Sequence, residues 1–161
     1  MSLKKYTLLA LLIAFFSVTG FAQDFVSWNY SSKKVSDNEV ELTFTAQIDS
    51  RYHMYTIDKV EDGPLPLEFE FEPSASYEMV GAITTNSPVK VEYDDQFDKD
   101  LPYYGESVVL TQRIKVLATE PFTIKGYLSY QICGEGTCIP GEEDFSFNIS
   151  GDLLPKEAGT A

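Results

Sequence analysis

Cys133 and Cys138 are the only two cysteines of the chain, and they are the residues whose type and spacing predict chemistry. Four residues separate them, and two of these are glycines that allow the backbone to turn back sharply. The two sulfurs can therefore come within bonding distance. Closing so short a ring removes little entropy from the unfolded chain, about 2 kcal/mol compared with about 5 kcal/mol for a ring of about 100 residues. The spacing alone leaves two interpretations open, a redox-active pair and a structural clip in a hairpin.

The first 22 residues have the pattern of a secretory signal peptide. Two lysines precede an apolar run over residues 8–16, and Gly20-Phe21-Ala22 ends the segment with the small-x-small pattern of a cleavage site. The apolar run is too short for a membrane anchor. We therefore expect cleavage after Ala22 and no membrane insertion of the mature chain. The expected location is the periplasm, where disulfides persist.

Charge and ligand chemistry exclude several classes of function. Without the signal peptide, 10 Lys and Arg face 25 Asp and Glu, a net charge of −15 with His53 neutral, so nucleic acid and anionic membranes are not expected partners. Two cysteines and a single histidine cannot complete a tetrahedral zinc site. We therefore expect no metal and no cofactor. A copper-handling module built from His53, Met54, Met79 and the two thiols remains an alternative.

The mature chain has the pattern of a β-protein. Residues 40–48 alternate apolar and polar side chains, as a strand with one buried face does, and residues 67–71 and 144–149 repeat the pattern. Apolar strands over residues 122–130 and 144–149 flank the cysteines, so the cysteine loop is expected at the tip of a hairpin or a longer excursion. Residues 94–105 are acidic, contain a proline and predict a loop.

About eight or nine such strands, with turn signals about every ten residues, predict an all-β fold. The expected architecture is an antiparallel immunoglobulin-like β-sandwich. We predict one domain over residues 23–150, preceded by the cleaved signal peptide (1–22) and followed by a flexible tail (151–161).

Four short motifs occur in an order that resembles a known family. They are Tyr52-His53-Met54-Tyr55, Gly63-Pro64-Leu65-Pro66, Asp94-Asp95-Gln96-Phe97, and the cysteine segment from Tyr130 to Pro140. Together they resemble the amino-terminal periplasmic domain of the transmembrane thiol:disulfide interchange protein DsbD. The resemblance spans roughly residues 52–147.

The resemblance implies an immunoglobulin-like domain whose cysteine pair shuttles electrons. A thioredoxin-like redox protein or a membrane electron transporter would supply them, and periplasmic disulfide isomerases or cytochrome-maturation proteins would receive them. It implies that Cys138 bonds to partners and that Cys133 resolves the mixed disulfide. It also implies a cap loop and a pocket around the disulfide, formed by Asp95, Phe97, Tyr52, Tyr55 and Tyr130.

Other features of the sequence leave alternatives open. Gly141 stands where many relatives have a second proline, and we expect it to loosen the loop. The membrane-spanning and thioredoxin-like portions of the full-length relative do not occur in the sequence, so we expect the donor to be a separate molecule. Acidic residues near the cysteines, Glu135, Glu142, Glu143 and Asp144, disfavour a thiolate and predict slow reaction with small oxidants. An immunoglobulin-like binding module with a structural disulfide and no redox role remains the alternative function.

Overall fold

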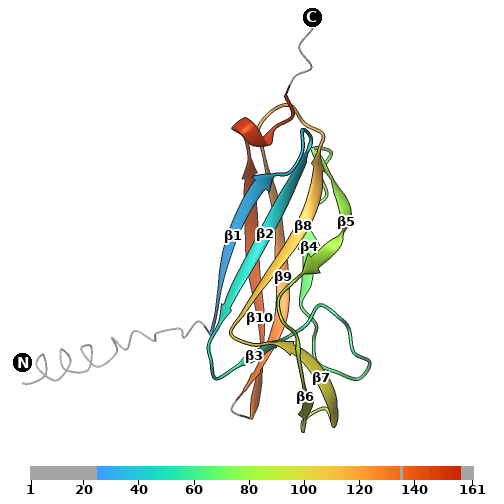
Figure 1. Cartoon of the computed structure of the whole chain (residues 1–161), viewed down its shortest axis with the longest axis vertical. Helices are drawn as coiled ribbons and strands as arrows, with labels where there is room; N and C mark the ends of the chain where they lie inside the picture. The colour runs from blue at the N-terminus through green and yellow to red at the C-terminus, as the bar shows by residue number, and fades with distance from the viewer. Residues whose placement is uncertain (1–24, 135, 157–161) are drawn as a thin grey trace, which may run out of the picture.

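The computed structural model describes residues 25–134 and 136–156. In these residues the chain forms ten strands and one short 3₁₀ helix, arranged as two antiparallel sheets (Figure 1). This confirms the predicted all-β, antiparallel immunoglobulin-like β-sandwich. None of the helical segments in the described part of the chain is long and apolar enough to cross a membrane. The predicted signal peptide lies outside the described residues.

The first sheet has four strands in the order β1-β2-β8-β5. Its strands are β1 (Val26–Lys34), β2 (Glu39–Ile48), β8 (Ser107–Val116) and β5 (Tyr77–Thr85). Strand β2 shows why the alternation in sequence predicts this layer. Its apolar residues, Val40 to Ile48 in steps of two, are all buried, while the residues between them are more accessible.

The second sheet is organised around the long strand β9 (Phe122–Gly134). Strand β9 pairs along its whole length with β10 (Thr137–Ile149). Its other edge is shared by two short strands, β4 (Glu68–Phe71) and β3 (His53–Tyr55). Beyond β3 the sheet continues through β7 (Lys99–Tyr104) to β6 (Lys90–Asp94). The β9–β10 tip therefore lies beside β3, β7 and β6 at one end of the molecule, the lower end in Figure 1.

Aromatic rings fill the space between the sheets. Phe44 of the first sheet is fully buried, and its ring centroid lies 4.8 Å from that of Phe69, 5.0 Å from that of Phe145 and 5.2 Å from that of Phe147. These three residues belong to β4 and β10 of the second sheet. The edge-to-face rings join the two layers and form the scaffold from which the cysteine hairpin extends.

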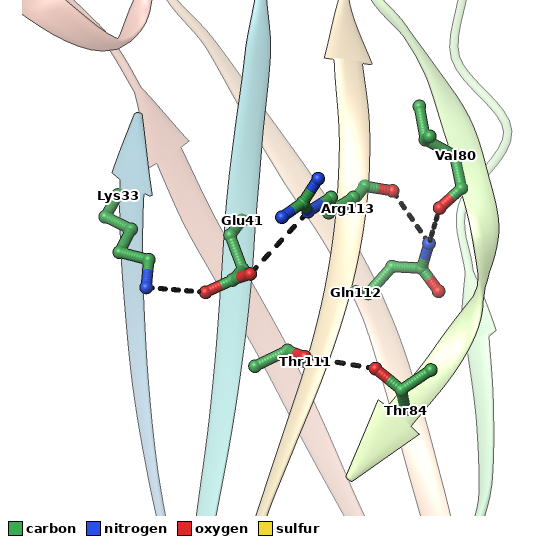
Figure 2. Close-up of polar contacts among 7 residues, drawn as sticks. All are labelled: Lys33, Glu41, Val80, Thr84, Thr111, Gln112 and Arg113. Carbon is green, nitrogen blue, oxygen red and sulfur yellow. Dashed lines mark hydrogen bonds and ion pairs between the residues drawn. The ribbon is translucent and has the colours of Figure 1, made fainter. Parts of the chain in front are cut away.

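Polar side chains connect neighbouring strands of the first sheet (Figure 2). Glu41 on β2 forms ion pairs with Lys33 on β1 (2.8 Å) and Arg113 on β8 (3.7 Å). The buried Gln112 amide donates to the carbonyls of Arg113 (2.7 Å) and Val80 (3.4 Å), where the pairing of β5 with β8 changes register. The Gln112 hydrogen bonds thus lie at the irregularity of β5, an edge strand of the first sheet.

The structure differs from the sequence expectation in three places. The predicted loop 94–105 contains strand β7, in which Pro102 is paired on one side only, with Val91 of β6, because the β3–β7 pairing ends at Tyr103. The hairpin strands run through both cysteines rather than stopping short of them. Residues Gly151–Leu153 form a 3₁₀ helix, and Leu154 accepts a 2.6 Å hydrogen bond from the Lys34 ammonium. The start of the predicted tail thus packs against β1, while residues 157–161 lie outside the described part.

Candidate functional site

Cys133 and Cys138 form a disulfide between directly opposed residues of β9 and β10. Their Cα atoms are 4.1 Å apart, the short spacing of a pair that does not share backbone hydrogen bonds. Gly136 lies in the turn with φ = +76°, a conformation that favours glycine. The glycine-containing spacing therefore folds back as predicted.

The disulfide belongs to a small apolar cluster that is separate from the main core. Its buried members are Tyr55, Leu101, Tyr103 and Cys133, and Val60, Phe97 and Cys138 pack against them. Alternation along β3 and β9 explains the separation, since Met54 and Ile132 point into the main core while their neighbours His53 and Cys133 point to the other face. The site therefore lies on the outer face of the second sheet.

The two sulfur-bearing residues differ in accessibility. Cys133 is only 3% exposed, whereas Cys138 is half-buried. A thiolate approaching from solvent must attack a disulfide sulfur along an open line. The geometry makes Cys138 the accessible sulfur and Cys133 the protected one.

A tight turn after β6 holds Phe97 over the cluster. The Asp94 carboxylate accepts a 2.6 Å hydrogen bond from the Tyr55 hydroxyl at Oδ2, and at Oδ1 it accepts the backbone N–H groups of Gln96 (2.8 Å) and Phe97 (3.3 Å). The Phe97 ring centroid lies 6.1 Å from that of Tyr55, edge to face. Phe97 is thereby placed beside the disulfide by a carboxylate that is itself anchored to β3.

Asp94 rather than Asp95 is the residue that organises this turn. Burial alone would raise the Asp94 pKa, but the hydrogen bonds from Tyr55 and from two backbone N–H groups hold that pKa below its ordinary value. Asp95 is exposed, and no hydrogen bond of its side chain defines the turn. Asp94 was not among the expected site residues, although an Asp side chain commonly accepts the backbone N–H of the residue two positions later, as in an Asx turn.

Comparison with known proteins identifies the family. Residues 22–149 match the family described as "Thiol:disulfide interchange protein DsbD, N-terminal". The chain belongs to this family. No curated protein sequence matches the chain significantly.

One solved structure shows the same fold as this DsbD N-terminal family member, and two others are similar to it at lower TM-scores. The N-terminal periplasmic domain of ScsB from Proteus mirabilis superposes with a TM-score of 0.57 at 20% identity, over 84% of this chain and 49% of that one. The chain thus spans about half the length of that relative. The reduced DsbD N-terminal domain from Neisseria meningitidis matches over 76% of this chain and 84% of its own, at 23% identity and a TM-score of 0.46.

A complex of the DsbD and PilB N-terminal domains, also from Neisseria meningitidis, matches at 19% identity and a TM-score of 0.48, over 83% of this chain and 88% of that one. The family and the Cys133–Cys138 disulfide together support thiol:disulfide exchange. They do not favour the alternative of a binding module with a purely structural disulfide.

Two of the five expected cap and pocket residues lie away from the disulfide cluster. The Tyr52 ring packs 4.7 Å from Phe25, and the Tyr130 ring lies 5.9 Å from Trp28, both at the margin of the main core. Tyr130 alternates with the site-facing positions of β9 and so lies on the inner face, and Tyr52 directly precedes β3. Of the expected set, the structure brings Phe97 and Tyr55 to the cysteines.

Gly141 does not loosen the cysteine loop, which was its expected role. It lies inside β10, directly opposite Tyr130, rather than in a loose loop. A Cβ atom at this position would lie 2.3 Å from Cζ of the Tyr130 ring. The glycine therefore makes room for the ring against the strand.

The turn Gly63-Pro64-Leu65-Pro66 is attached next to the site. The backbone N–H of Leu65 donates a 2.8 Å hydrogen bond to the Gln131 side chain, two residues before Cys133. The Lys99 ammonium donates to the Glu61 carbonyl at 2.8 Å and ties the preceding segment to β7. Leu65 is 58% exposed, so it offers an apolar side chain to solvent close to the hairpin.

The members of the alternative copper set do not come together. Met54 is fully buried in the main core, and Met79 lies on β5 of the other sheet. Among residues 25–134 and 136–156, no group of three or more His, Cys, Asp and Glu side chains could hold a metal ion. His53 instead pairs with Cys133 across the sheet, with its ring 4.5 Å from Tyr103 and 5.2 Å from Tyr55.

We predict a pH dependence of stability that originates at His53. Burial lowers the His53 pKa below 6.5, although Asp94 and Glu92 act in the opposite direction. The unfolded chain therefore binds a proton at a higher pH than the folded protein does. Above about pH 6.5 His53 has no effect, and the free energy of unfolding decreases as the pH falls from 6.5 through the lower pKa of the folded state.

Urea unfolding at a series of pH values measures this effect. Since His53 is the only histidine, His53→Gln should flatten the curve between pH 6.5 and 5 while leaving the steeper acid limb below about pH 4. An unchanged slope in the variant would show that His53 is not the group responsible.

Proposed function

We propose that this domain is a periplasmic dithiol carrier that exchanges electrons with protein partners through Cys133 and Cys138. The asymmetry of the disulfide supports this role, since Cys133 is buried while Cys138 is accessible beside Phe97. A structural clip has no need for an accessible sulfur under a separately anchored aromatic ring. The signal-peptide pattern of residues 1–22 supports export to the compartment in which such exchange takes place.

The exchange proceeds in two balanced steps. A donor thiolate attacks Cys138 Sγ, a new donor–Cys138 disulfide forms, and the Cys133–Cys138 bond breaks with its electron pair on Cys133. A second donor thiol then attacks the donor sulfur of the mixed disulfide and releases the Cys138 thiolate. The domain is now a dithiol and the donor is a disulfide. Running the same steps in reverse reduces the disulfide of a recipient.

The proposed partners are proteins rather than small thiols. Phe97 lies against the cluster, and Asp94 and the exposed Asp95 place negative charge on the turn that holds Phe97. A small anionic disulfide is repelled by this charge. As donor we propose a thioredoxin-like redox protein or a membrane electron transporter. As recipients we propose a periplasmic disulfide isomerase or cytochrome-maturation proteins.

Mixing the oxidised mature protein with a stoichiometric amount of reduced thioredoxin tests the proposal. We expect thiols to appear on Cys133 and Cys138 as thioredoxin becomes oxidised, as measured by acid quenching, alkylation and mass spectrometry. A disulfide that remains intact at equilibrium with thioredoxin and with a reduced disulfide isomerase would contradict a carrier role.

The position of Phe97 predicts that it limits access to Cys138. Phe97→Ala should increase the rate at which oxidised glutathione reacts with the reduced protein, by about tenfold, because it removes the ring without touching either sulfur. Phe122→Ala is the matched control, since Phe122 is a partly buried aromatic at the far end of β9. Equal rates for the parent and Phe97→Ala would show that the ring does not shield the site.

A further inference from the structure

Gln96 is a side chain whose polar group lies against a reacting sulfur. Its amide oxygen position is 3.3 Å from Cys138 Sγ. The backbone N–H of Gln96 donates to Asp94 Oδ1 at 2.8 Å, so the residue is held by the same turn that positions Phe97. Gln96 is an exposed residue.

A primary amide suits a sulfur that changes its hydrogen-bonding character during a reaction. A disulfide sulfur carries no hydrogen, a thiol is a weak donor, and a thiolate accepts hydrogen bonds. By turning over, the amide can present its oxygen to the thiol and its N–H to the thiolate, and the two orientations occupy almost the same space. A carboxylate of the same size could only accept a hydrogen bond from the thiol and could not donate one to the thiolate.

The charges around Cys138 make such a donor valuable. Asp94 and Asp95 lie on the same turn as Gln96 and directly precede it in the chain. Lys99, the lysine of β7, lies opposite Asp94 across the sheet, and its ammonium donates to the Glu61 carbonyl. Negative charge near a thiol disfavours ionisation, so a neutral N–H donor can offset the effect without adding charge.

We propose that Gln96 stabilises the thiolate of Cys138 by donating a side-chain N–H to its sulfur, and so sets the rate of exchange at that residue. The inference rests on the proposed function, in which Cys138 forms the bond to the partner. The proton released by Cys138 goes to solvent. The thiolate attacks a partner disulfide, the Cys138–partner bond forms, and the partner's other sulfur leaves with the electron pair and is reduced.

The test isolates Cys138 in a Cys133→Ala protein. The Cys138 thiol pKa is measured from thiolate absorbance near 240 nm against pH, and the rate of reaction with oxidised glutathione is measured at neutral pH. Gln96→Ala removes the donor, and Gln96→Glu replaces it with an isosteric anion. Gln47→Glu, an exposed position on β2, is the control that makes the same charge change away from the site.

We expect Gln96→Ala to raise the thiol pKa and to slow the reaction by about tenfold, because a hydrogen bond to a charged group is lost. Gln96→Glu should raise the pKa further and slow the reaction more, while Gln47→Glu should change neither. The proposal is overturned if both Gln96 variants keep the pKa and rate of the parent.

If Cys133 rather than Cys138 forms the bond to the partner, a different result is expected. Cys133, isolated in a Cys138→Ala protein, would then react faster with oxidised glutathione than Cys138 does in the Cys133→Ala protein. The pKa comparison at Cys138 would still decide the role of Gln96 in that case, because it needs no partner protein.

Discussion

Cys138→Ala is expected to abolish thiol:disulfide exchange, whereas Cys133→Ala is expected to stop it after the first step. The difference follows from burial, since Cys133 is 3% exposed behind the cluster of Tyr55 and Leu101 and Cys138 is the accessible partner. Without the Cys138 thiol, the exchange rate should fall to background, by about 1,000-fold or more. Without the Cys133 thiol, the mixed disulfide between Cys138 and the partner cannot be resolved and should persist.

Non-reducing electrophoresis and mass spectrometry of each variant with oxidised thioredoxin measure the outcome. Only the reduced Cys133→Ala protein should accumulate a covalent complex. The reverse pattern, a complex trapped by Cys138→Ala and none by Cys133→Ala, would contradict the assignment of the two sulfurs. Equal accumulation in both variants would show that burial does not select between them.

Phe44→Ala is expected to lower the free energy of unfolding by about 3–5 kcal/mol. Phe44 is fully buried and its ring contacts those of Phe69, Phe145 and Phe147 across the sandwich, so its truncation leaves a cavity between the two sheets. Denaturant unfolding monitored by tryptophan fluorescence measures the change, since Trp28 is the only tryptophan.

Val109→Ala serves as the control for Phe44→Ala. Val109 lies on β8 of the same sheet but is 42% exposed, so its truncation should cost less than about 1 kcal/mol. At a temperature at which Phe44→Ala stays folded, its exchange rate should match that of the parent. A small loss of stability for Phe44→Ala would mean that the aromatic layer does not hold the sheets together.

Much of the fold could be predicted because a strand that buries only one face alternates apolar and polar residues. The alternation over residues 40–48 specifies a strand with one buried face, and the structure confirms it in β2. Strand β7 was missed because Pro102 and the surrounding acidic residues suggest a loop. Pro102 lies opposite Val91 of β6 and beyond the end of the pairing with β3, and the strands that flank it belong to distant segments that the local pattern does not contain.

The candidate site could be predicted only as far as the cysteines, Tyr55 and Phe97. Tyr130 and Cys133 are three residues apart and therefore on opposite faces of a strand, a parity that is decisive only once β9 is known to extend through Cys133. Asp94 and Asp95 are adjacent and chemically equivalent in sequence. Which of them accepts the N–H groups of Gln96 and Phe97 is decided by the turn geometry and by the Tyr55 hydroxyl.

The aromatic sandwich also explains why the cysteines are free to react. The main core contains residues of both sheets and does not include the disulfide cluster. Opening a ring as small as the Cys133–Cys138 loop should cost about 2 kcal/mol of unfolded-state entropy. A domain of this size has a core large enough to remain folded after that loss. Both the disulfide and the dithiol can thus exist on the same scaffold.

The reduction potential of the Cys133–Cys138 disulfide tests the central claim, that this pair exchanges electrons with redox proteins, most directly. Equilibration of the mature protein with glutathione or dithiothreitol buffers, followed by thiol alkylation and mass spectrometry, gives the value. We expect a potential between about −270 and −120 mV, the range spanned by thioredoxin, disulfide isomerase and DsbA. A potential below about −300 mV, typical of structural disulfides, would contradict it.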